Sequence, residues 1–436
     1  MKKETQGKKL QGLKGFYVLW ATQGLSQLGS TMTNFALALW LYQKTGSALH
    51  TALLSVYSYA PYVLVSMFAG ALSDKWDKKK TMLVCDTLAA CCTLTVFGLF
   101  HTGWLSPWHL YLLNAVNGLM NTIQSPASDV AVTLLAPKEQ YQKVGGLQSL
   151  SHSLITILHP LLATSLYAAG GMNVVIAVDL ATFAVAFLSL LCFVQLPVLA
   201  PAASESDRQE SLWQSVKEGL RCLQEQWQVL LLILFLAGVN LVASAFDAVL
   251  PAFVLPREQG GEAVLGMVTS TAGAAMLVGS ILASLLPAPK NRVRVIWLTM
   301  LLSLTIDNAM MSLTRVPALW CVAQVFGYLP VPLMNTNLDV IVRSSIPAEM
   351  QGRVYSCRNT LQFFTIPVGF LLGGWLVDSI CEPWMELQSE GSLLVCLFGE
   401  GKGSGAAMVI FLLGVLGAVI CLVFGRLLEK AVSLRR

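Results

Sequence analysis

Long apolar segments alternate with short polar or charged connections along the whole chain. A helix of about 20 mostly apolar residues is long enough to cross the hydrocarbon layer of a bilayer. Segments of this kind lie near residues 15–42, 51–72, 81–103, 109–134, 144–169, 172–196, 228–255, 264–286, 295–314, 318–345, 354–379 and 405–428. Because lipid offers no hydrogen-bond partners to the backbone, each segment is expected to be helical. The pattern predicts an all-α integral membrane protein with twelve transmembrane helices.

Composition supports this assignment and excludes other classes of protein. The 436 residues are 55% hydrophobic and only 12% charged, whereas soluble domains carry about 25% charged residues. A soluble globular protein and a disordered chain are therefore both excluded. The 10 Cys are also too sparse for a disulfide-stabilised scaffold.

The distribution of Lys and Arg predicts the orientation. If the N-terminus is cytoplasmic, 24 of the 28 basic residues fall in cytoplasmic segments. Cytoplasmic loops of membrane proteins carry such an excess of Lys and Arg. We therefore expect both termini in the cytoplasm and a multi-pass location in the cell (plasma) membrane.

Residues 197–227 form a long connection at the midpoint of the chain. Its first part is rich in Pro, Ala and Ser, and its second part carries Leu212, Val216, Leu220 and Leu223 at helical spacing. The second part is predicted to be an amphipathic helix on the inner leaflet. The expected organisation is an N-terminal six-helix bundle (1–196), a cytoplasmic linker (197–227) and a C-terminal six-helix bundle (228–436).

The two halves show weak internal similarity. A shift of 210 residues aligns Asp129-Val130 with Asp339-Val340, and Pro137 with Pro347. Parallel six-helix repeats are typical of transporters that work by rocking of two halves around a central site. The alternative is a coincidental likeness between two helix–loop–helix segments.

Residues 70–80, Gly-Ala-Leu-Ser-Asp-Lys-Trp-Asp-Lys-Lys-Lys, lie between the second and third predicted helices. This loop resembles the signature loop of the major facilitator superfamily. It differs by Ser73, where the pattern has Ala, and by Asp77, where the pattern has Gly. Since Asp adopts a left-handed backbone less readily than Gly, we expect an altered turn at Asp77.

Residues 23–30, Gln-Gly-Leu-Ser-Gln-Leu-Gly-Ser, and the Gln124-Ser-Pro126 segment are similar to one branch of that superfamily, the macrolide-efflux and siderophore-exporter group of drug:proton antiporters. The resemblance implies export of amphipathic small molecules, such as macrolide-like drugs, by proton antiport and alternating access. Two rivals stay open: an importer or lipid transporter of the same fold, and a membrane ligand sensor.

The resemblance also implies a gate. In this family the loop Asp and a basic residue form a charge cluster with an acid at the inner end of the fourth helix. The matching residues are Gly70, Asp74, Lys78 and Asp129. The alternative is an ordinary solvated loop.

Three acids fall inside predicted helices, where charge is costly and usually functional. They are Asp179, Asp247 and Asp307. The first, fourth, seventh and tenth helices line the cavity in the family, so Asp247 is the best candidate for proton coupling, and the other two are expected on peripheral helices. His159, before Pro160, is a further candidate because imidazole titrates near neutral pH. Alternatively, the acids pair within the bundle and His159 is a neutral hydrogen-bonding residue.

Polar and aromatic side chains on the predicted helices are candidates for substrate binding. The first helix carries four polar residues spaced by four, three and four positions, which predicts a face turned into the bundle. The candidates are Gln23, Gln27, Ser30, Asn34, Tyr59, Tyr62, Asn240, Ser244, Tyr328 and Asn335. The alternative is that they hold helices together by hydrogen bonds.

No sequence pattern indicates an enzyme, a metal site or a nucleic-acid module. The Gly399–Ser404 segment lacks the spacing of a phosphate-binding loop, so we expect no cofactor and a proton gradient as the energy source. The expected partners are a small-molecule substrate and membrane lipids, without nucleic acid, and the protein is expected to work as a monomer. Whether Cys381 and Cys396 form a disulfide is left open.

Overall fold

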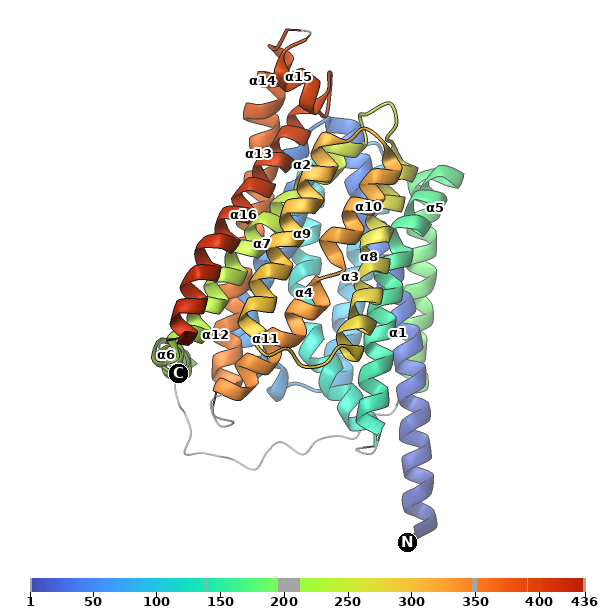
Figure 1. The fold of residues 1–436 in the computed structure, drawn as a ribbon. Helices are drawn as coiled ribbons and strands as arrows, with labels where there is room; N and C mark the ends of the chain where they lie inside the picture. Colours follow the sequence, from blue (N-terminus) through green and yellow to red (C-terminus); the bar gives the residue numbers. More distant parts are fainter. Residues whose placement is uncertain (1, 138–139, 195–211, 347–350, 390, 434–436) are drawn as a thin grey trace. The chain divides into compact units, whose positions relative to one another are not determined.

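The computed structural model describes residues 2–137, 140–194, 212–346, 351–389 and 391–433 (Figure 1). Within these ranges the regular elements are helices, and no strand is present. The chain divides into two compact units: unit 1 comprises Met1–Leu37 and Tyr57–Glu210, and unit 2 comprises Ala38–Val56 and Ser211–Arg436. The architecture is therefore all-α, as predicted.

Unit 1 is built from five helices: α1 (Lys2–Thr45), α2 (Ala48–Lys75), α3 (Lys78–His101), α4 (Pro107–Leu135) and α5 (Tyr141–Cys192). Phe16 of α1, Met82 of α3, Ala131 of α4 and Leu190 of α5 meet in a buried apolar cluster. The last turns of α1 and the first turns of α2 belong instead to unit 2. Each of these two helices thus continues from one unit into the other.

Helix α5 covers the segments predicted as the fifth and sixth spans. Its helical path is interrupted at Gly170 and Gly171, and Gly171 has φ 66° and ψ −163°. This backbone conformation is accessible to glycine and strained for other residues. The predicted boundary between the two spans is therefore a sharp kink.

Unit 2 contains the remaining helices (Figure 1). They are α6 (Leu212–Glu225), α7 (Trp227–Val254), α8 (Glu262–Leu285), α9 (Arg292–Leu313), α10 (Pro317–Tyr328), α11 (Val331–Ser345), α12 (Gln351–Phe363), α13 (Thr365–Leu376), the π-helix η3 (Val377–Cys381), α14 (Glu382–Glu386), α15 (Leu393–Phe398) and α16 (Ser404–Ser433). Helix α16 packs along α7 and α9. Helix α6 lies in the predicted linker, whose Pro-rich first part falls outside the described residues.

The segment predicted as one helix over 318–345 is two helices. Helix α10 ends at Tyr328, and α11 begins at Val331 after Leu329 and Pro330. Proline lacks a backbone N–H and its ring crowds the preceding turn, which explains the break. Sequence hydrophobicity alone did not reveal it.

Nine helical segments of the described chain are long and apolar enough to cross a membrane. One of them, Lys143–Cys192, includes the kink at Gly170–Gly171 and spans two of the predicted segments. Helices α1 and α4 are long enough but are not among the nine. Both helices carry polar residues inside their apolar stretches, and these residues line a cavity of unit 1.

Two local expectations are resolved by the structure. Asp77 has φ −63° and ψ 118°, and its carboxylate accepts a hydrogen bond from the Lys80 backbone N–H at 2.8 Å. The expected difficulty with a left-handed backbone at Asp77 was therefore wrong, since this residue is an extended N-cap of α3. Cys381 and Cys396 are free thiols.

Candidate functional site

A polar cavity of about 500 Å³ lies inside unit 1, between α1, α3, α4 and α5. Its wall includes all four of the polar residues predicted to share one face of α1. The polar side chains that line the cavity are Gln23, Ser26, Gln27, Ser30, Thr31, Asn34, Asp86, Thr93, Asn121, Gln124, Ser125, Ser128, Asp129 and Asp179. The polar residues that lower the hydropathy of α1 and α4 therefore line this cavity.

Asp86 is an acid of the cavity that is held by two side-chain amides. Its carboxylate accepts hydrogen bonds from the side-chain amides of Gln23 in α1 at 3.1 Å and Gln124 in α4 at 2.7 Å. The residue is buried. A carboxylate held by two neutral donors keeps its negative charge uncompensated, so it can attract a proton or another cation.

Sequence reasoning missed Asp86, although the criterion that selected the other acids applies to it. Asp86 lies inside the apolar stretch of the third predicted helix, where a charged residue is costly. Asp86 stands only eight positions after Lys78. In the sequence it therefore looks like part of the charged segment that begins at residues 70–80. In the sequence, Gln124 stands out only through the Gln124-Ser-Pro126 resemblance.

Asp179 also reaches this cavity. Its carboxylate accepts hydrogen bonds from Ser30 of α1 at 3.1 Å and Thr93 of α3 at 3.4 Å. At Gly29, beside Ser30, a Cβ atom would lie only 2.3 Å from the Thr182 hydroxyl and 3.0 Å from the Asp179 carboxylate. The absence of a side chain at Gly29 therefore allows α1 to approach α5. Asp179 was expected on a peripheral helix, but it forms part of the cavity wall.

The residues predicted to form the gate are only partly described. Asp129 is exposed and lines the cavity, and Lys78 is buried in the first turn of α3. Gly70 and Asp74 lie in the last turns of α2, and the side chain of Asp74 falls outside the described part of the structure. The charge cluster stays a prediction.

Unit 2 contains a second pair of acids, both within candidate membrane spans. Asp247 of α7 is exposed on unit 2 and accepts a hydrogen bond from the Tyr328 hydroxyl of α10 at 3.2 Å. Asp307 of α9 is buried and accepts a hydrogen bond from the Gln324 amide at 3.4 Å. A Cβ atom at Gly327 would lie 2.2 Å from the Asp307 carboxylate, so the glycine makes room for it. Helix α10 therefore brings donors to both acids.

The other candidates have varied surroundings. Asn240 donates from its side chain to the Gln362 carbonyl at 2.9 Å, and the Ser244 hydroxyl donates to the Asn240 carbonyl at 2.7 Å. His159 is bonded through Nδ1 to the Ile155 carbonyl at 3.0 Å. These contacts are those of helix-stabilising residues. Exposed side chains among the candidates are Tyr59 and Asn335, whereas Tyr62 is intermediate.

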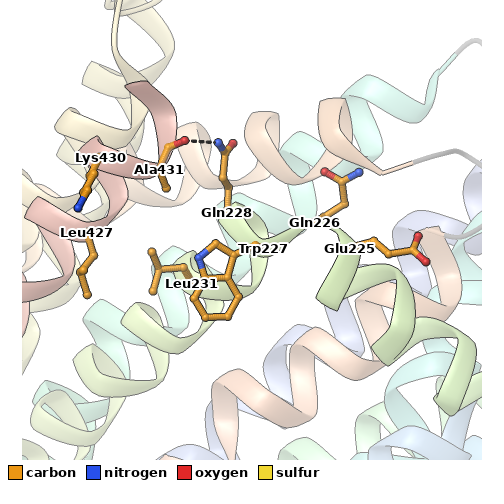
Figure 2. A pocket seen from close by; sticks show the side chains of 8 residues that line it. All are labelled: Glu225, Gln226, Trp227, Gln228, Leu231, Leu427, Lys430 and Ala431. Atoms are coloured by element: carbon orange, nitrogen blue, oxygen red, sulfur yellow. Dashed lines mark hydrogen bonds between the residues drawn. The ribbon is translucent and has the colours of Figure 1, made fainter. Parts of the chain in front are cut away.

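A groove of about 410 Å³ in unit 2 has a different character. It lies where α6 and α7 meet the end of α16, and Figure 2 shows the Gln228 amide donating to the Ala431 carbonyl, at 2.6 Å. Trp227 is exposed beside it. Glu225 at its edge pairs with Arg221 at 3.5 Å. The groove has no buried acid and is a weaker candidate for transport than the cavity of unit 1.

Arg257 is a charged residue outside the candidate membrane spans that has structural partners. Arg257, after α7, donates to the carbonyls of Phe398 and Gly403 at 2.9 and 3.2 Å. Burial, followed by the nearby charge of Arg315, lowers the pKa of Arg257 to about 10. The guanidinium is therefore still charged at neutral pH, where it holds α15 and the start of α16. Within the described ranges, no group of three or more His, Cys, Asp or Glu side chains is arranged to hold a metal ion.

Comparison with known proteins identifies the family of this chain. The model of the Major Facilitator Superfamily matches residues 19–287, which include the whole wall of the unit 1 cavity. The chain belongs to the major facilitator superfamily. It is a multi-pass membrane protein of a transport family.

Relatives and solved structures of this superfamily extend the comparison over almost the whole chain. Macrolide efflux protein A of Streptococcus pyogenes is 25% identical over 388 residues, which cover 88% of this chain and 94% of the relative. The inward-facing, unoccupied structure of a bacterial homologue of the human lysosomal transporter Spinster has a TM-score of 0.67 at 14% identity, covering 96% of this chain and 98% of that one. An inward-facing bacterial homologue of the iron transporter ferroportin also has a TM-score of 0.67, at 14% identity, over 95% and 99% of the two chains. The superfamily fold is thus shared along the length of the protein.

Proposed function

We propose that this major facilitator protein exports amphipathic small molecules, with macrolide-like compounds as the first class to test, by proton antiport through alternating access. The observation that carries the proposal is the unit 1 cavity, in which Asp86 and Asp179 meet neutral hydrogen-bond donors. Among the described residues that line this cavity there is no Lys, Arg or His. The cavity is therefore negatively charged when its acids are ionised.

Such a cavity provides a simple basis for coupling. In a membrane interior a carboxylate is stabilised when a proton or a cationic group neutralises it. A proton and a cationic, amphipathic substrate would therefore compete for the same acids. Loading of one after release of the other couples their movements in opposite directions.

The likeness to Macrolide efflux protein A supports the direction of transport and the class of substrate. The match covers 94% of that relative. It therefore includes both halves of a transporter and not a single shared segment. Export is accordingly favoured over import, lipid transport and ligand sensing.

Twelve transmembrane segments with cytoplasmic termini are part of the proposal. The nine candidate spans include the kinked segment Lys143–Cys192, which is long enough to cross twice. Helices α1 and α4 add two more if their polar faces line the cavity. The proposed protein works as a monomer in the plasma membrane, contacts its substrate and lipids, needs no cofactor, and has no enzymatic or nucleic-acid activity.

Two further parts of the mechanism follow from the family resemblance. Asp247 is the proposed coupling acid of unit 2, with Asp307 as a second candidate there. His159 and Asp179 of unit 1 are further candidates for proton coupling. Asp74, Lys78 and Asp129 are the proposed gate, whose opening and closing would accompany the exchange of states. Neutralising Asp74 would then shift the protein toward the inward-facing state.

Uptake of a radiolabelled macrolide into inverted membrane vesicles tests the function. An acidic vesicle lumen should drive accumulation of the macrolide, and a protonophore should abolish it. Counterflow in proteoliposomes, which needs no proton gradient, separates a transporter from a ligand sensor. Absence of both accumulation and counterflow across a panel of amphipathic cations would overturn the proposal.

A further inference from the structure

Asp378 of η3 binds the beginning of α2, although the two are far apart in the sequence. Its carboxylate accepts hydrogen bonds from the backbone N–H groups of Ala48 at 3.0 Å and Leu49 at 2.8 Å, and from the Ser47 hydroxyl. The Ser47 hydroxyl oxygen in turn accepts from the His50 N–H at 3.1 Å. All five residues belong to unit 2.

This contact provides hydrogen-bond acceptors for backbone N–H groups at the start of α2. The first N–H groups of an α-helix have no partner within the helix, and a carboxylate at that end is further stabilised by the helix dipole. Ser47 is the local cap of α2, and Asp378 supplies the remaining acceptors from another helix. The start of α2 therefore depends on η3 for its hydrogen bonds.

The surrounding packing is shaped for this contact. Gly374 lies one turn before Asp378, and a Cβ atom there would lie 2.7 Å from the Leu49 Cα. Close to it, Ala52 of α2 packs against Ala248 and Phe370. Asp378 itself lies in a π-helix, an irregularity that occurs often at functional sites. Replacement of Gly374 by any larger residue must push α2 away from α13.

The last turn of α1 makes contacts of the same kind. The Gln43 side chain donates to the Glu262 carboxylate at the start of α8, and the Tyr42 hydroxyl lies 3.5 Å from the Ala252 carbonyl of α7. Residues 38–56 are thus attached to the rest of unit 2 through α7, α8, α13 and η3. Outside this segment, α1 and α2 both continue into unit 1.

We infer that Asp378 is a positioning residue that latches the turn between α1 and α2 onto η3, and that this latch opens and closes during transport. The inference rests on the proposed alternating-access function, in which the two bundles separate on one side at a time. The latch joins unit 2 to the two helices that enter unit 1. Its release would free them to move with unit 1.

The chain offers a matched control, Glu382, four residues after Asp378. Its carboxylate accepts a hydrogen bond from the Gly403 N–H at 2.6 Å, just before α16. Helix α16 lies wholly within unit 2. Glu382 therefore holds a helix start inside one unit, whereas Asp378 holds a helix that leaves it.

The test measures access to the latched surface without any substrate. In a Cys-free protein reconstituted in nanodiscs, Ala52→Cys reports on the latch and Ala407→Cys reports on the interior of unit 2. Both positions are almost fully buried, at 1% and 0% exposure. Maleimide labelling rates are compared in the background of Asp378→Asn, Gly374→Ala and Glu382→Gln.

We expect Asp378→Asn and Gly374→Ala to raise the labelling rate at Ala52→Cys by about tenfold or more. Both oxygens of Asp378 accept hydrogen bonds, and Asn would place an NH2 donor where one of them stands, whereas Gly374→Ala disturbs the close packing. The rate at Ala407→Cys should change by less than about twofold, and Glu382→Gln should leave the rate at Ala52→Cys within the same range. Gly374→Ala, and Ser47→Ala, test the latch without altering Asp378 should Asp378→Asn not fold.

Unchanged labelling at Ala52→Cys in the folded latch variants would overturn the inference. Equal increases at both reporter positions would also overturn it, since they indicate general loosening of unit 2. The proposed function fails separately, by absence of vesicle uptake and counterflow in the wild-type protein.

Discussion

Gln23 of α1 and Asp86 of α3, 63 positions apart in the chain, are joined by a hydrogen bond of 3.1 Å inside unit 1. Gln124 of α4 donates to the other oxygen of the same carboxylate. Three helices therefore meet at one acid, and this acid faces the polar cavity. The proposed transport cycle depends on the negative charge of Asp86, for which a proton and a cationic substrate would compete.

Asp86→Asn is expected to abolish proton-driven accumulation of substrate and to leave part of the downhill exchange. Asn keeps the size of the side chain but cannot take up and release a proton. Uptake into inverted vesicles with and without a pH gradient measures both activities. Asp77→Asn, at the N-cap of the same helix, is the control: Asn caps a helix as well as Asp does, so uptake should stay within about twofold. Wild-type accumulation by Asp86→Asn would remove this acid from the coupling mechanism.

Asp247→Asn tests the proposed coupling acid of unit 2. We expect loss of uphill export with retention of some exchange, provided that the protein reaches the membrane in normal amounts. Tyr328→Phe is the companion variant, because it removes the hydroxyl donor and leaves the carboxylate. It should reduce the rate of export without uncoupling it. Should Asp247→Asn accumulate substrate at the wild-type rate, coupling lies elsewhere, and Asp307, Asp179 and His159 are tested in that order.

The predicted orientation can be tested by labelling from outside intact cells. In a Cys-free background, a Cys introduced at Lys290 should resist an impermeant maleimide, because the excess of basic residues predicts a cytoplasmic loop there. A Cys introduced at Ser389 should react. Permeabilised cells provide the control, since both positions should then be labelled. The opposite pattern in intact cells would reverse every assignment of sides.

Alanine substitutions at two glycines of unit 1 are expected to have opposite effects on stability. At Gly118 of α4 a Cβ atom would lie 2.0 Å from the Ser58 carbonyl oxygen of α2, whereas at Gly98 of α3 it would meet nothing within 4 Å. Gly118→Ala should lower the free energy of unfolding by about 1–3 kcal/mol, because the two helices must separate. Gly98→Ala should be neutral or stabilise by about 0.5–1 kcal/mol, since alanine favours the helix. Thermal unfolding in detergent measures both, and equal midpoints for the two variants would contradict the close packing of α2 and α4.

Hydrophobic periodicity along the sequence was sufficient to predict an all-helical membrane protein. The cost of unpaired backbone groups in lipid leaves helices as the structure for long apolar segments. The spacing of Gln23, Gln27, Ser30 and Asn34 likewise predicted that they share one face of α1, because helix geometry brings residues three and four apart together, and all four line the cavity of unit 1. The loop at residues 70–80 pointed to the superfamily that the family model matches.

The tertiary structure decided which distant residues meet. The partners of Asp86 come from α1 and α4, and hydrophobicity along one helix carries no information about the neighbours of its polar residues. Asp179 was assigned to a peripheral helix, but the close approach at Gly29 brings its carboxylate to the cavity. The contact of Asp378 with the start of α2 spans 330 positions between Ala48 and Asp378. Local sequence determines which segments become helices, since their hydrogen bonds are local; the meeting of acids, amides and helix ends depends on how those helices pack.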